Sequence, residues 1–149
     1  MNRRWRRALT VGAAAAVIIG GTVAVASGDD GSVGRSAFNE QLSGYQEDPS
    51  VLSTTGNGEF RAQINDEKQE IAYRLSYEEL EGTVTQAHIH LGGAAQSGGI
   101  SVFLCSNLGN GPAGTPACPQ SGTVEGSIEA ADVVGPAGQG IEAGNLPEI

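Results

Sequence analysis

Apolar and polar residues alternate with a period of two along short stretches of this 149-residue sequence, and no other feature limits the fold as strongly. The stretch 69–80, QEIAYRLSYEEL, shows the pattern most clearly. Its apolar set is Ile71, Tyr73, Leu75 and Tyr77, and its intervening set is Glu70, Ala72, Arg74 and Ser76. Successive side chains of a strand point to opposite faces, whereas a helix would need a period near 3.6. The pattern therefore predicts a half-buried strand.

Comparable stretches recur along most of the chain, separated by glycine-rich or polar connections. They are residues 37–42, 58–64, 69–80, 83–93, 98–106 and 122–130. Residues 98–106 are apolar almost throughout, as expected for a central strand, and Val124 and Ile128 are the expected inward side chains of the last stretch. Short strands at this spacing predict one all-β domain, an antiparallel β-sandwich or barrel.

The first 26 residues have the pattern of a secretory signal peptide. Four arginines in MNRRWRR precede an uncharged apolar run that ends in Ala24-Val25-Ala26. We predict a signal helix over residues 1–26 with cleavage after Ala26, a flexible linker over 27–35 and the β domain over 36–149. The competing interpretation is an uncleaved membrane anchor, for which the run is marginal in length. Cleavage predicts a secreted protein, with the periplasm or the cell surface as alternative locations.

Cleavage would also change the charge. It leaves four of the eight basic residues against all 17 acidic ones, a formal charge of −13. Such a surface repels phosphate backbones and anionic lipids, so nucleic acid is excluded as a partner and membrane insertion is not expected after cleavage. Solubility outside the cell explains the charge, and calcium or a basic protein partner is the more specific alternative.

Cys105 and Cys118 are the only cysteines, and they enclose a Gly/Pro-rich segment. An even count in a secreted chain predicts a disulfide between them. The alternative, a pair of metal-binding cysteines, would want a spacing such as C-x-x-C.

His88 and His90 are the only histidines. On a strand they would share one face with Val84 and Gln86, while Ala87, Ile89 and Leu91 would take the other. Two imidazoles at this spacing can reach one copper or zinc ion, but even an open zinc site needs three protein ligands. Two interpretations stay open: a metal site at His88 and His90, or two rings that bond to neighbours on a sheet face.

The sequence gives little support to an enzyme, and we predict no catalytic residue. It contains no G-x-S-x-G nucleophile motif and no calcium loop of the D-x-D-x-D-G type. The glycine-rich segments at 56–58, 92–99, 109–111 and 138–140 do not link a strand to a helix in a βαβ unit. They therefore indicate turns rather than phosphate loops. The acidic run Glu78-Glu79-Leu80-Glu81 is interpreted as a solvated loop.

Three motifs resemble the CHRD domain, named for chordin and also found in bacterial secreted proteins. They are Leu42-Ser43-Gly44, Thr55-Gly56 before a strand, and A-H-I-H at Ala87 to His90. The two-cysteine loop and the following ADVVGPAGQGI look like the bacterial members, and the similarity covers roughly residues 36–146. The resemblance implies an all-β extracellular module. The H-x-H strand also resembles one that supplies copper ligands in copper/zinc superoxide dismutase.

The chain departs from the family pattern in two places. Glu47-Asp48-Pro49 stands where members usually carry a Glu-Val-Pro-like triplet. The final hairpin of the family, with a further histidine, is missing after Ile149, so we expect a C-terminal truncation.

These observations predict a secreted, non-catalytic binding or structural module for an unknown extracellular protein or ligand, without a cofactor. The alternative function is a copper- or zinc-binding protein of the superoxide dismutase type, and a third interpretation is a truncated product that does not fold independently.

Overall fold

The computed structural model describes residues 36–93 and 96–149. The predicted signal peptide with Ala24 and Ala26, and the predicted linker, lie outside the described residues. The described part contains the strands β1 Ala37–Ser43, β2 Asn57–Asn65, β3 Glu70–Glu78, β4 Gln86–Leu91, β5 Gly99–Ser106 and β6 Gly122–Ile128. The predicted strands are therefore confirmed, with boundaries that differ by a few residues. Short 3-10 turns follow β1 and β6, and among the described residues no helix is long and apolar enough to cross a membrane.

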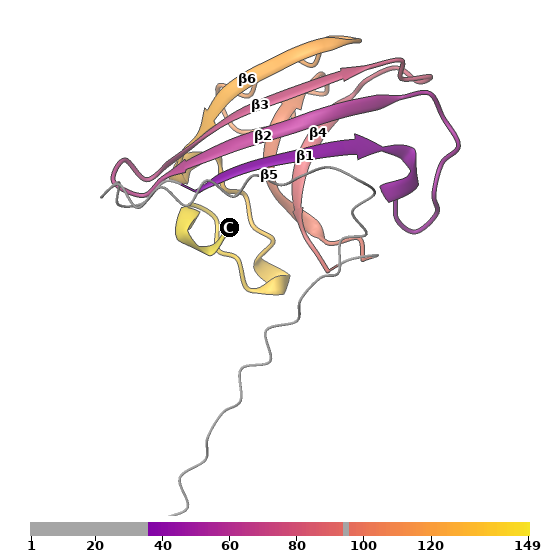
Figure 1. The fold of residues 1–149 in the computed structure, drawn as a ribbon. Coiled ribbons are helices and arrows are strands. Elements are labelled where there is room, and N and C mark those ends of the chain that lie inside the picture. Colours follow the sequence, from indigo (N-terminus) through magenta and orange to yellow (C-terminus); the bar gives the residue numbers. More distant parts are fainter. Residues whose placement is uncertain (1–35, 94–95) are drawn as a thin grey trace, which may run out of the picture. The chain divides into compact units, whose positions relative to one another are not determined.

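The strands form two antiparallel sheets that face each other (Figure 1). The larger, sheet A, has the order β1-β2-β3-β6, and the smaller, sheet B, consists of β4 and β5. Within sheet A, Phe60 lies opposite Leu75, and Leu75 lies opposite Val124. Directly opposed residues share a face, so the apolar sets of successive strands make one continuous apolar surface. The predicted all-β antiparallel fold class is confirmed as a sandwich.

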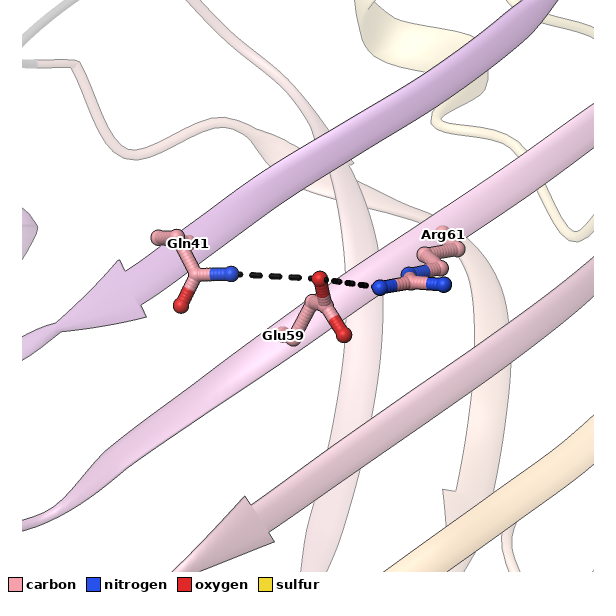
Figure 2. Close-up of polar contacts among 3 residues, drawn as sticks. All are labelled: Gln41, Glu59 and Arg61. Atoms are coloured by element: carbon pink, nitrogen blue, oxygen red, sulfur yellow. Dashed lines mark hydrogen bonds and ion pairs between the residues drawn. The ribbon is translucent and has the colours of Figure 1, made fainter. Parts of the chain in front are cut away.

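The core lies between the two sheets. Sheet A contributes Tyr73, Leu75, Tyr77, Val124 and Ile128, and sheet B contributes Val102, Leu104 and Cys105. The inward orientation predicted for Val124 and Ile128 is confirmed, because both are buried. The opposite face of sheet A is polar. There, Glu59 accepts hydrogen bonds from the Gln41 amide at 3.2 Å and from Arg61 at 2.8 Å (Figure 2).

Burial on the inner face of sheet A decreases from β6 to β1. The large inner side chains of β6 and most of those of β3 are buried and those of β2 are half-buried, while Phe38 and Leu42 of β1 are 49% and 40% exposed. Two strands cannot cover four, so the inner face of β1 and part of β2 extend beyond sheet B. The alternation in β1 correctly places Phe38 and Leu42 on the inner face, with Glu40 between them, but that face has no partner among the described residues.

The two edges of sheet B differ. The outer edge of β5 is partnered, because Val133 forms a bridge with Val102 and the Val134 N–H bonds to the Ser101 carbonyl at 2.9 Å. The segment that follows places Ile141 and Leu146 in the core. The outer edge of β4 pairs with no strand in the described part of the chain. Sheet B is therefore covered on the β5 side and open on the β4 side.

Candidate functional site

Strand β4 carries both histidines on one side, as predicted. The His88 and His90 ring centroids are 5.5 Å apart, and the His88 ring packs edge-on against Phe103 at 4.7 Å. The pairing of β4 with β5 shifts register twice, between Ala87 and His88 and between Ile89 and His90. The placement of Val84 with the histidines was wrong. Val84 precedes the strand and packs against the core with Ala87 and Ile89, because the alternation begins only at Gln86.

The two imidazoles have different surroundings. His88 is half-buried, and its Nε2 is buried with no hydrogen-bond partner. Burial, and next the proximity of His90, lower the pKa of His88, because both disfavour the imidazolium. His90 is exposed, and its Nδ1 lies 2.8 Å from the Gly98 carbonyl oxygen. A carbonyl can only accept, so Nδ1 carries the hydrogen and Nε2 of the neutral His90 ring keeps its lone pair.

The candidate metal ligands are His88 and His90. Among residues 36–93 and 96–149, no group of three or more His, Cys, Asp and Glu side chains is placed to bind one ion. His88 and His90 therefore stay a predicted metal site.

The disulfide predicted between Cys105 and Cys118 is present and joins the end of β5 to a glycine-rich loop. Asn107 holds the same loop with its side chain. Its amide donates to the carbonyl oxygens of Val84 and Cys118, and its Oδ1 accepts from the Cys118 N–H, each at 2.9 Å. Gln120 adds bonds to the Val84 N–H and the Gly82 carbonyl. These contacts fix the segment that leads into β4.

An apolar concavity opens beside the start of β4, at the end of sheet A where β1 ends and β2 begins. This apolar groove has a volume of about 510 Å³ and is mainly lined by carbon. Its principal apolar side chains are Leu42, Leu52, Leu75, Leu80, Val84 and Ala87. They come from β1, the β1–β2 loop, β3, the β3–β4 loop and the start of β4.

Two glycines allow the groove to form. At Gly44 a Cβ would lie 2.4 Å from the Leu52 carbonyl oxygen, and the Leu52 N–H bonds to the Gly44 carbonyl at 2.7 Å. Only a residue without a side chain permits this approach, which folds the β1–β2 loop back and presents Leu52. At Gly56 a Cβ would lie 2.9 Å from Leu80 Cδ2, so this glycine makes room for Leu80.

Sequence reasoning missed this site. Leu52 lies in the connection between the predicted strands 37–42 and 58–64, and Leu80 lies in the run interpreted as a solvated loop. The sequence did contain a signal for it, namely the family motifs Leu42-Ser43-Gly44 and Thr55-Gly56, and Ala87 of the A-H-I-H motif. All three motifs supply residues that line or shape the groove.

The surroundings of the groove are acidic. Glu47 lines it, and Glu81 accepts a bond from the Thr54 hydroxyl at 3.2 Å beside it. The basic residues of the described part lie elsewhere. Arg61 pairs with Glu59 and Arg74 with Glu125, all on the outer face of sheet A. Lys68 sits in the β2–β3 hairpin, roughly 20 Å from Leu75 along the strand at about 3.3 Å per residue.

Comparison with known proteins gives one match. A family model described as the CHRD domain matches residues 38–145, a range that includes both histidines, both cysteines and the whole groove. No curated protein matches the chain, and no solved structure does.

Proposed function

The chain belongs to the CHRD domain family, and from that premise we propose that it is a non-catalytic binding module that works outside the cytoplasm. The apolar groove carries the proposal. Leu52 is 54% exposed, and Leu42 and Leu80 beside it are also exposed. Clustered apolar surface in contact with water is unfavourable, and such patches on folded proteins commonly mark binding sites.

The location outside the cell has separate support. CHRD domains are extracellular-type domains, and the Cys105–Cys118 disulfide suits an oxidising compartment. The signal-peptide pattern of residues 1–26, with cleavage after Ala26, agrees with export. Release of this segment leaves the acidic domain, which favours a partner without excess negative charge.

The alternative proposal is a copper or zinc site at His88 and His90. It is supported by the buried Nε2 of His88, which has no partner among the described residues, and by the lone pair available on His90. A metal bound by these two nitrogens would need further ligands, and no third His, Cys, Asp or Glu of the described residues is placed beside them. We therefore place this proposal second.

The experiment uses the full chain exported by a secreting host, whose intact mass reports whether residues 1–26 are removed. A neutral solvatochromic dye is titrated into the protein, and its emission reports transfer into an apolar site. We expect saturable binding that is lost in Leu52→Asp and retained in Leu108→Asp. Leu108 is a matched control, because it is 60% exposed, lies in the disulfide loop and does not line the groove. Equal binding by both variants would contradict the proposal.

A further inference from the structure

We propose that the partner is an extended, basic segment of another polypeptide, which adds as a strand to the open edge of β4 and lays its apolar side chains in the groove. The inference rests on the proposed function, because it names the class of partner for the same groove. It requires a free strand edge, an apolar surface beside that edge, and a charge that selects the partner.

The groove meets the edge of β4 at the start of the strand. Gln86 and Ala87 are adjacent in the strand, so their side chains point to opposite faces, and both line the groove. The edge there pairs with no strand of the described chain, whereas Val133 partners the opposite edge of the sheet. An unpaired edge offers a row of N–H and C=O groups that an extended peptide can satisfy.

A strand added at this edge would lie beneath the end of sheet A that lines the groove. Its inward side chains would contact Leu42, Leu52 and Leu80, which are exposed now. Its backbone would pair with β4, and its other side chains would point to solvent. A strand addition therefore uses both features at once: backbone bonds supply affinity, and alternate side chains supply specificity.

Charge selects a basic partner over a second copy of this chain. Glu47 lines the groove, Glu79 and Glu81 flank Leu80, and no lysine or arginine of the described residues lies at the groove. A symmetric dimer through the β4 edge would place the same patch of both copies together. The acidic groups of one copy would then face those of the other, which is unfavourable. A segment flanked by lysine or arginine places opposite charges there instead.

The probe is a synthetic peptide of about nine residues, long enough to span β4. It has alternating valine and threonine in the centre and two lysines at each end. Binding to the exported protein is measured by fluorescence anisotropy. We expect saturable one-to-one binding that weakens about tenfold or more in Leu52→Asp and is retained in Leu108→Asp. The double variant Glu47→Gln and Glu81→Gln should bind more weakly and depend less on salt concentration.

Two further peptides test strand addition itself. One carries N-methyl groups on the odd-numbered backbone nitrogens and the other on the even-numbered ones, so each loses the donors of one edge. Only one edge of an added strand pairs with β4, so one peptide should lose binding about tenfold or more and the other should retain it. Equal binding of both would overturn strand addition. A peptide with glutamates in place of the lysines should not bind, and equal affinity for it would overturn the charge requirement.

The proposed function and this inference fail separately. If the dye binds at Leu52 but the lysine-flanked peptide does not, the groove remains a binding site and the strand-addition inference is wrong. If neither dye nor peptide binds, both fail. Sedimentation of the protein alone as a dimer, with Leu52→Asp monomeric, would make a second copy the occupant and overturn the partner proposed here.

Discussion

The Tyr73 hydroxyl donates a hydrogen bond of 2.6 Å to the Leu104 carbonyl oxygen and thereby joins the two sheets through the core. Tyr73 lies in β3 of sheet A and Leu104 in β5 of sheet B, and both residues are buried. The bond links β5 of sheet B to β3 of sheet A and adds a polar contact to the apolar core between them.

Replacement of Tyr73 by phenylalanine removes this bond and leaves the ring. We expect a loss of about 1–2 kcal/mol in the free energy of unfolding, because the Leu104 carbonyl would stay buried without its partner. Urea denaturation measures the change. Tyr77→Phe is a comparison, since Tyr77 donates to the less buried Pro119 carbonyl at 2.6 Å and should cost less. A Tyr73→Phe protein as stable as the wild type would show that the bond does not couple the sheets.

Asn107→Ala should lower the free energy of unfolding by about 1–3 kcal/mol, because it removes two hydrogen bonds across the loop to the Cys118 backbone and one from the loop to the Val84 carbonyl. Asn107→Asp keeps an acceptor for the Cys118 N–H but loses both donors, so it should also destabilise. Urea denaturation of oxidised protein gives the comparison. Wild-type stability in Asn107→Ala would contradict the role assigned to this side chain.

The disulfide should contribute more to the free energy of unfolding than any single hydrogen bond of the loop. It connects residues separated by 13 positions, and closing a loop of this length stabilises a fold by about 3 kcal/mol in the chain-entropy model. The variant Cys105→Ala with Cys118→Ala should therefore unfold at a lower urea concentration by a corresponding amount. An unchanged midpoint would mean that Asn107 and packing alone hold the loop.

His88 should make stability depend on pH. Its folded-state pKa is lowered, by burial first and by His90 second, from an ordinary value of 6.5. The unfolded chain therefore takes up the proton at a higher pH than the folded one. This contribution to stability is fully present above about pH 6.5 and is lost as the pH falls below it. Urea midpoints between about pH 7.5 and pH 5 should decline less in His88→Phe than in the wild type.

His90→Gln is the control for that series, because it leaves the larger cause, burial, in place. It should retain most of the decline. A decline of equal size in wild type and His88→Phe would assign the pH dependence to other groups.

Metal titration decides the alternative function. Two imidazoles without a third ligand make a weak site, so we expect equimolar zinc or copper to leave the thermal midpoint unchanged. The measurement is thermal unfolding with and without metal, together with calorimetric titration. Saturable one-to-one binding that raises the midpoint and disappears in His88→Ala would instead establish the metal site.

The sequence by itself determined the strands. A period of two reflects covalent geometry, so the alternation over residues 69–80 identified β3 and its inward side chains without knowledge of their neighbours. Val124 and Ile128 followed from the same rule. The disulfide followed from counting, because only one pair of cysteines exists.

Tertiary structure decided what the strands enclose. No local pattern states that β1 and β2 lie in a sheet of four above a sheet of two, so the exposure of Phe38 and Leu42 could not be read from their alternation. Leu52 and Leu80 lie in connections, where no periodicity assigns a side chain to a face. Both line the groove because Leu52 lies close to Gly44 and Leu80 lies close to Gly56, and these contacts join residues that are not neighbours in the sequence. Strands arise from local backbone geometry, whereas a groove arises from the number of strands on each side of the core, which is a property of the assembled sheets.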